Sequence, residues 1–330
     1  MAKVKSGSAF AVAAAAVWLG SAGAGAAHAA SGDYPNRPIR IIVPLAPGGG
    51  SDYTARFIAP RLSDRVGQPV VVDNRPGASG ILGTDLVAKA TPDGYTLLLA
   101  YSTHAQSAQL FEKLPYDPLK DFAPVTIVIV TPLTMQLHPS VPAKTVKEFI
   151  AYAKQNEGKI NYGSSGPGSS PHLTTELFNS MAGIRMTHIP YKGVGQYITA
   201  QLGNEIQFSF ANMFTTMPHW KAGRLRLVAS TGVKRLEAVP ELPTIAESGL
   251  PGFESLTWYA FMAPAKTPRP IVNKLQQEIR AIVFSPDVKK QFIDQGNEPL
   301  ASSPEEFAKI MKSDAEKWGA IGRKLGVKLD

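Results

Sequence analysis

The sequence has no cysteine and only six histidines among its 330 residues. The first absence excludes disulfide bonds, thiol nucleophiles and cysteine metal ligands. The histidines show no HxxxH or HExxH spacing, so the sequence does not support a metal site. We therefore expect neither a metal nor another cofactor.

Runs of basic residues are also missing, although the chain carries 34 Lys and Arg against 26 Asp and Glu. The basic residues are scattered singly, without the clusters and interleaved aromatics typical of nucleic-acid binders. We expect no nucleic-acid partner. A mild positive field favours small anionic molecules.

Only one long apolar run is present, and it lies at the N-terminus. Lys3 and Lys5 precede "AFAVAAAAVWLGSAGAGAA", and the small-x-small pattern "AHA" follows at Ala27 to Ala29. This order predicts a signal peptide over residues 1–29, cleaved near Ala29, and a protein exported to the periplasm. A membrane anchor is the alternative, which the Ala/Gly-rich run disfavours. Loss of the two lysines lowers the net charge from +8 to +6.

The rest of the chain alternates between short β-rich runs and helical patterns. The predicted strands cover residues 39–45, 69–74, 93–100, 126–139, 159–163, 185–190, 205–211 and 224–231. The predicted helices cover residues 51–67, 80–90, 146–156, 169–183, 194–204, 215–223, 268–284 and 303–326. Pro132 predicts a bent or edge strand. Alternation of this kind indicates an α/β fold with mostly parallel sheets flanked by helices.

The alternation occurs twice, with extended segments near residues 130 and 258. We interpret these segments as two crossings between two lobes that enclose a cleft. The predicted boundaries are residues 30–130 plus 259–330 for lobe 1 and residues 131–258 for lobe 2.

Three consecutive glycines, Gly48 to Gly50, stand between the first strand and the first helix. In parallel α/β sheets, ligands bind at the carboxyl ends of strands, against helix N-termini that attract anions. Bare glycine amides can approach such a ligand closely, Ser51 can donate a hydroxyl, and Asp52 can cap the helix. A tight turn without a ligand explains the triplet equally well.

A second loop of the same kind runs through "NYGSSGPGSSPHL", residues 161–173. It offers serine hydroxyls and glycine amides, with Ser170 expected to cap the next helix and Pro171 at its first position. If the lobes face each other, both loops approach one ligand from opposite sides.

Several enzyme motifs fail in this sequence. No lysine follows either glycine loop, as a P-loop requires, and Pro171 replaces the third glycine of a dinucleotide fingerprint. The nucleophile-elbow motif GxSxG is also absent, because Pro167 stands where its last glycine should be. A serine hydrolase of small esters, using Ser165 with His104 or His172, remains an alternative from another class.

Many segments, in one order, resemble the Bug family of periplasmic receptors for tripartite tricarboxylate transporters. They include "YPNRPIRIIVPLAPGGGSD", "GQPVVVDNRPGASG", "INYGSSGPGSSPHL", "HIPYKG", "LPTIAESGLPGF" and "LTWYAFMAPAKTP". The resemblance implies a type II-like Venus-flytrap fold, no catalysis, and capture of a dicarboxylate, tricarboxylate or aromatic acid. It also implies a monomer that delivers its ligand to a large and a small integral membrane subunit. Some family members act in sensing, so a sensor kinase is an alternative partner.

The resemblance also points to the residues that bind the ligand. They lie in four loops and at the end of one strand: Gly49, Gly50, Ser51, Tyr101, Thr103, His104, Ser164, Ser165, Gly166, Ser169, Ser170, His172, Tyr191, Lys192, Gly193 and Asn212. Three of them have plainer alternatives. His104 can cap a helix, His172 can face its own lobe, and Lys192 can be a solvated surface charge.

Overall fold

The computed structural model describes residues 34–325 except residues 107, 109 and 112. The predicted signal peptide lies outside the described residues. From Pro35 onward the described residues form one compact unit. Within the described part of the chain, every helix is too short or too polar to cross a membrane.

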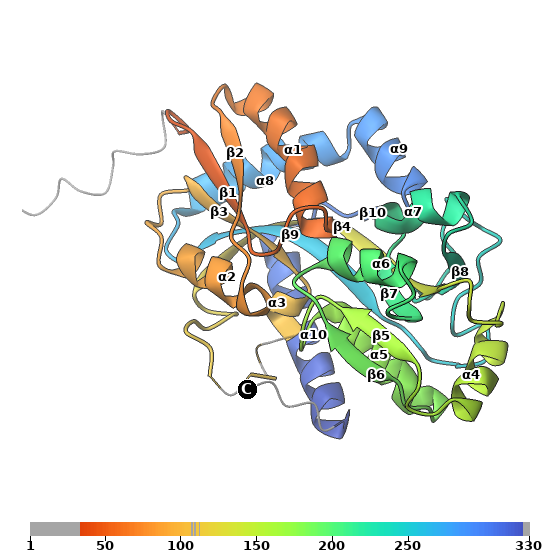
Figure 1. The fold of residues 1–330 in the computed structure, drawn as a ribbon. Coiled ribbons are helices and arrows are strands. Elements are labelled where there is room, and N and C mark those ends of the chain that lie inside the picture. Colours follow the sequence, from red (N-terminus) through yellow and green to blue (C-terminus); the bar gives the residue numbers. More distant parts are fainter. Residues whose placement is uncertain (1–33, 107, 109, 112, 326–330) are drawn as a thin grey trace, which may run out of the picture. The chain divides into compact units, whose positions relative to one another are not determined.

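Ten strands form one mixed sheet in the order β2-β1-β3-β9-β4-β7-β5-β6, with β8 and β10 also paired to β4 (Figure 1). The strands are β1 (Ile39–Val43), β2 (Val70–Asn74), β3 (Thr96–Tyr101), β4 (Phe122–Leu137), β5 (Asn161–Ser164), β6 (Thr187–Pro190), β7 (Phe208–Asn212), β8 (Arg226–Ser230), β9 (Leu256–Pro264) and β10 (Glu298–Pro299). Pairing is parallel among β1, β2 and β3 and among β5, β6 and β7. Every ladder made by β4 or β9 is antiparallel.

Helices connect the strands and cover the sheet. They are α1 (Gly50–Val66), α2 (Ile81–Ala88), α3 (Thr103–Gln106), α4 (Val146–Gln155), α5 (Ser170–Ala182), α6 (Val194–Leu202), α7 (Met213–Lys221), α8 (Arg269–Val283), α9 (Pro286–Asp294) and α10 (Pro304–Leu325), with the short 3-10 turn η1 (Ala78–Gly80). We call β1–β3 with α1, α2 and α8–α10 the first lobe, and β5–β8 with α4–α7 the second lobe.

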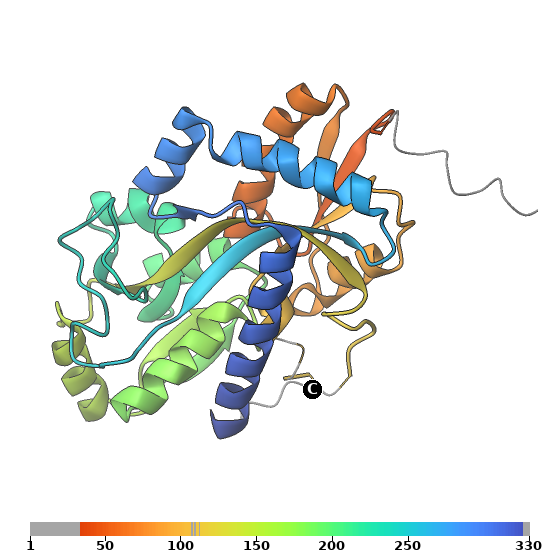
Figure 2. The same ribbon diagram turned by 180° about the vertical axis from the view of Figure 1, so that it is seen from behind.

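Each lobe has an apolar core. In the first lobe, Ile42 and Leu98 of the sheet pack with Val87 of α2 and Phe307 of α10. Figure 2 shows that α10, the dark blue helix, begins beside the crossing strands and runs downward at a steep angle to them. The core of the second lobe is rich in phenylalanine, including Phe149, Phe178, Phe208, Phe210 and Phe253.

Strands β4 and β9 run from one lobe into the other (Figure 1). The first part of β4 pairs with β9, and its last residues, from Leu133 on, pair with β7 and β8. The two crossings predicted near residues 130 and 258 are direct neighbours, because Val130 pairs with Trp258. The exact lobe boundaries stay a prediction.

Pro132 lies in a central strand rather than at a sheet edge, although its ladder with β9 is irregular nearby. Proline cannot donate a ladder hydrogen bond, which is why it is rare in central strands. Here it stands just before the residue at which β4 gains its second-lobe partners, and Leu133 donates its N–H to Thr231 Oγ1 instead (2.8 Å). The chain tolerates Pro132 because the pairing changes at this point.

Candidate functional site

The N-termini of four helices, α1, α5, α6 and α7, meet at one pocket between the two lobes. The pocket is lined by Leu45, Ala46, Gly49, Gly50, Ser51, Tyr101, Leu133, Ser165, Ser170, Pro171, Gly193, Val194, Tyr197, Asn212, Thr257 and Tyr259. Each helix N-terminus carries unpaired backbone N–H groups and a partial positive charge. The four together favour an anion.

The loop before α1 is held by its own helix. Asp52 accepts a hydrogen bond from the Gly48 N–H (3.0 Å) and pairs with Arg56 (2.9 Å). The N-cap residue of α1 is Gly49, so Asp52 is not the helix cap that the sequence predicted; it lies in the first turn and holds the preceding loop instead. Gly50 lies against the Tyr259 side chain so closely that a Cβ atom would overlap the phenol group. Only glycine permits this approach, which brings the first amides of α1 to the pocket.

The loop before α5 contacts the first lobe directly. Ser170 donates its N–H to Thr103 Oγ1 (3.1 Å), and its Oγ lies 2.8 Å from Ser102 Oγ. The N-cap residue is Ser169, not Ser170 as predicted from the sequence, and its Oγ donates to the Gly166 carbonyl (2.7 Å). The prediction was wrong because the Ser170 hydroxyl bonds across the cleft rather than to its own helix.

A further hydrogen bond connects the crossing strand β9 with the second lobe. Tyr259 donates its hydroxyl to Asn212 Oδ1 (2.7 Å). Burial raises the pKa of Tyr259 above its usual value, so the phenol stays protonated as the donor. Both residues line the pocket.

Two buried hydroxyls in the pocket wall have no hydrogen-bond partner. Ser51 is 1% exposed and Thr257 is 3% exposed, and neither side-chain oxygen is paired. An unpaired buried hydroxyl costs about 1–3 kcal/mol, so it is rare unless a ligand or water completes it. None of the described residues that line the pocket carries a charge. The arrangement therefore suits an anion held by amides and hydroxyls.

Half of the sixteen predicted ligand-binding residues line this pocket: Gly49, Gly50, Ser51, Tyr101, Ser165, Ser170, Gly193 and Asn212. Contact of these residues with a ligand stays a prediction. The lining also includes residues that the sequence analysis missed, above all Thr257 and Tyr259. Both lie in a strand of continuous apolar character, which gave no signal of a binding role.

The other eight predicted residues lie around the pocket without lining it. Thr103 contacts Ser170, as described above, while Tyr191 and Lys192 precede α6, where Lys192 is exposed. Gly166 has a φ of 111°, a conformation that favours glycine, and it lies against Ser79 of the first lobe. The remaining four are Ser164, Ser169, His104 and His172.

His104 is buried beside Tyr116 and Phe122, and its Nε2 lies 2.8 Å from the Pro118 carbonyl. Burial lowers the pKa of His104 to about 4, so the ring is neutral near pH 7. In this conformation His104 holds the loop after β3 and does not reach the pocket.

Two stacked histidines support the loop before α5 from behind. The rings of His172 and His188 lie 4.2 Å apart. His172 Nδ1 accepts the Gly168 N–H (3.0 Å), and His188 Nε2 lies 2.6 Å from Ser164 Oγ. Burial lowers the pKa of His172 to about 3 and that of His188 to about 4. Neutral imidazoles thus shape this loop.

We expect the melting temperature to fall when the pH is lowered from 7 to 5. An unfolded histidine takes up a proton near pH 6.5, whereas folded His172 and His188 stay neutral to about pH 3–4. In that window the unfolded chain binds more protons, so folding stability decreases with falling pH. Calorimetry of the variant His172→Asn, which retains an acceptor for Gly168, should show a flatter pH dependence than the unsubstituted protein. The change His138→Asn, at a more exposed histidine whose pKa is also lowered by burial, should flatten the slope less, and equal slopes in all three proteins would contradict this assignment.

Two α/β lobes on shared crossing strands, with helix N-termini facing a cleft, define the class of two-lobe periplasmic binding proteins. Comparisons with known proteins agree with this class. The family model described as "Tripartite tricarboxylate transporter family receptor" matches residues 54–327. The chain belongs to this receptor family.

Individual relatives are similar over nearly their full length. Protein BugT of Bordetella pertussis is 36% identical over 315 residues, 95% of this chain and 96% of BugT. The solved structure of Rpa4515 of R. palustris with adipate is 34% identical, with a TM-score of 0.87 over 90% of this chain and 99% of that one. MatC of Rhodopseudomonas palustris, solved with bound malate, is 30% identical, with a TM-score of 0.83 over 87% and 99% of the two chains.

Proposed function

We propose that the protein is an exported solute receptor that captures a small carboxylate between its lobes. The observation that carries this proposal is the uncharged pocket at which four helix N-termini meet two unpartnered hydroxyls. Such a site holds a carboxylate through backbone amides and hydroxyls, without an arginine clamp.

The pocket size suggests how the ligand enters. The cavity has a volume of about 40 Å³. One water needs roughly 10–15 Å³ on this measure, so a carboxylate group fits but a longer acid does not. We infer that the lobes move apart to admit the ligand and then close on it, with the bonds of Ser170 and Tyr259 completing the closed form.

The ligand class follows from the relatives and from the pocket chemistry. Rpa4515 was solved with adipate and MatC with malate, which are both dicarboxylates. We propose a dicarboxylate as the ligand of this chain, with a tricarboxylate or an aromatic acid as the alternatives. Residues 1–29 direct the chain to the periplasm, where the monomer delivers its ligand to the membrane subunits of a tripartite transporter.

A role as a hydrolase has less support. Within the described part of the chain, serine–histidine hydrogen bonds join Ser164 to His188 and Ser140 to His138. Ser164 is fully buried, and Ser165, which does reach the pocket, has no histidine partner among the described residues. We propose that the protein binds its ligand without transforming it.

The experiment that tests this function is calorimetric titration with adipate, malate, citrate and benzoate. We expect one of these acids to bind at a single site. Gly49→Val places methyl groups against Val194, whose Cγ1 is already only 3.1 Å from the position of a Cβ. Ser165→Leu removes a hydroxyl from the opposite wall. Both variants should bind about tenfold or more weakly while keeping the far-ultraviolet circular dichroism of the folded protein.

The matched control is Gly195→Val in α6, where a Cβ meets no neighbour. It should bind as tightly as the unsubstituted protein. Unchanged affinity in both pocket variants would refute the site, and hydrolysis of ester analogues that is lost in Ser165→Leu would favour the enzyme instead.

A further inference from the structure

A second and larger cavity lies on the other face of the crossing strands. Its volume is about 290 Å³. It shares no lining residue with the pocket between the lobes, which we call the carboxylate pocket. We call it the rear pocket; it is lined by Val130, Pro132, Gly232, Val233, Lys234, Arg235, Leu236, Glu237, Leu256, Phe284, Lys289, Ile293, Gly296, Asn297, Glu298 and Pro299.

The alternation of strand side chains explains why the two cavities are separate. Pro132 and Leu256 face the rear pocket, whereas the next residues, Leu133 and Thr257, face the carboxylate pocket. Successive residues of a strand point to opposite faces of the sheet. The rear pocket is therefore a distinct site and not an extension of the cleft.

Both lobes contribute walls to the rear pocket. Residues 232–237 follow β8 of the second lobe, while Ile293 belongs to α9 of the first lobe. Between them lie apolar side chains of the crossing strands, and Val233 is 68% exposed at the rim. A guest in this cavity would contact both lobes at once.

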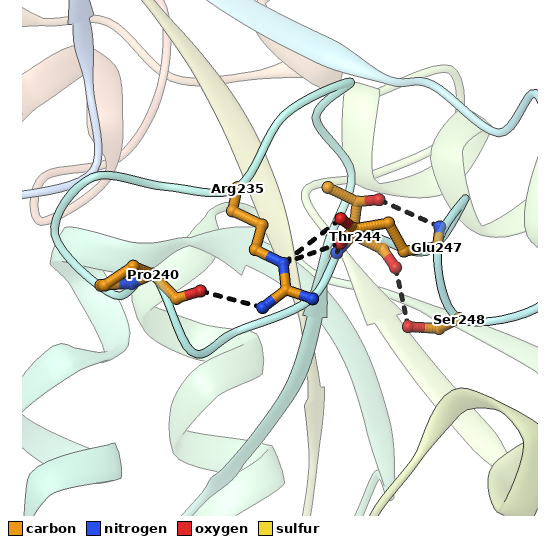
Figure 3. A network of polar contacts seen from close by, with 5 residues as sticks. All are labelled: Arg235, Pro240, Thr244, Glu247 and Ser248. Carbon is orange, nitrogen blue, oxygen red and sulfur yellow. Dashed lines mark hydrogen bonds and ion pairs between the residues drawn. The ribbon is translucent and has the colours of Figure 1, made fainter.

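The charged residues of the rim largely neutralise one another. Figure 3 shows the Arg235 guanidinium turned toward Glu247, which accepts from its Nε (3.0 Å), and toward the Pro240 carbonyl (3.1 Å). The same close-up shows the Thr244 carbonyl accepting from Ser248, which fixes this loop. Lys234 pairs with Glu298 at 3.5 Å. One charge of each sign is then left in the described lining, on Lys289 and Glu237, so the rim gives no preference for an anion.

Asn297 supplies the polar feature of the wall. It is 4% exposed, and neither its amide nitrogen nor its amide oxygen has a hydrogen-bond partner. Leaving both a donor and an acceptor unpaired in a mostly apolar wall is costly. A single water can satisfy the amide, but it leaves the apolar part of the cavity unfilled.

We propose that the rear pocket binds an uncharged small molecule with a carboxamide on an apolar body. A carboxamide presents a donor beside an acceptor and so completes both atoms of Asn297, which a carboxylate cannot do because it lacks a donor. The apolar body covers Val130, Leu256 and Ile293. This preference is opposite to that of the carboxylate pocket.

The test is ligand-observed saturation-transfer NMR with 1 mM benzamide and the purified protein, followed by titration. Benzoate and acetophenone, which match the ring but lack the amide donor, serve as comparison probes. We expect saturation of benzamide and at least tenfold weaker binding of the two other probes. Asn297→Leu removes the amide at similar volume, and Ile293→Trp fills the cavity from α9 without touching the amide. Each should weaken benzamide binding at least tenfold.

Lys290→Trp adds the same large ring to the exposed side of α9 and should leave benzamide binding unchanged. Retention of benzamide by Ile293→Trp, or no saturation in the unsubstituted protein, would overturn the pocket. Retention by Asn297→Leu would overturn its specificity for carboxamides. None of these outcomes depends on whether a carboxylate binds in the cleft.

Discussion

Replacing Gly50 by valine should weaken capture of the carboxylate about a hundredfold. The new Cβ would occupy the space of the Tyr259 phenol, which lies against the Gly50 backbone. Tyr259 would have to move, and with it would go the hydrogen bond to Asn212 that connects β9 with the second lobe. Overpacking of this kind costs about 1–3 kcal/mol, and the lost bond adds to it. Titration calorimetry with the acid that the panel identifies measures the effect.

The overlap is already present in the ligand-free structure, because Tyr259 is held beside Gly50 by its pairing with Tyr101 of the first lobe. The melting temperature without ligand should therefore fall as well, while the far-ultraviolet circular dichroism at 25 °C still shows a folded protein. Gly195→Val is again the matched control, since it also adds a branched side chain near a helix N-terminus. An unaltered affinity in Gly50→Val would show that the pocket does not depend on the approach of Tyr259.

Removing the two unpartnered hydroxyls should weaken binding at least as much. The double variant Ser51→Ala, Thr257→Val takes away two donors that no protein group uses. A hydrogen bond to a charged group contributes about 1.5–3 kcal/mol, so loss of both should weaken binding by a hundredfold or more. The free protein should be as stable as before or slightly more stable, because buried unpaired oxygens are removed.

The control for this prediction is a buried hydroxyl that does have a partner. Thr126 Oγ1 donates to the Ser302 carbonyl (2.8 Å) in the first lobe. Thr126→Val should lower the free energy of unfolding by about 1–3 kcal/mol and leave affinity unchanged. Thermal unfolding and titration of both variants distinguish the two roles. Lost stability without lost affinity in the double variant would mean that these hydroxyls are structural.

Much of the fold could be predicted from periodicity. The strands and helices around the glycine loops lie within a few residues of their expected positions, and the crossings were recognised as extended segments. Helices α3 and α9 and strand β10 were missed, and α3 has only four residues. Strand β10 has only two residues, and α9 follows α8 after only two residues, so the pattern gave no visible break between the helices. The antiparallel pairing of β4 and β9 was also invisible, since partners in a ladder are set by tertiary contacts.

The candidate site could likewise be predicted only in part from the sequence. The glycine and serine loops stand out in the sequence because helix N-termini need bare amides and capping hydroxyls. Thr257 and Tyr259 do not stand out in the sequence, because their neighbours are apolar residues of the kind found in any central strand. His172 and His188 illustrate a different limit. Their stacking behind the loop joins residues from α5 and β6, and no spacing rule connects them.

The position of β9 in the sheet has a consequence for how the chain matures. This strand lies between β3 and β4, so the first lobe is complete only after residues 256–264 have been made. Until then the edges of both neighbouring strands are open, and Leu98 to Tyr101 lack their partners. A polypeptide that emerges from the ribosome in order therefore cannot finish its N-terminal half first.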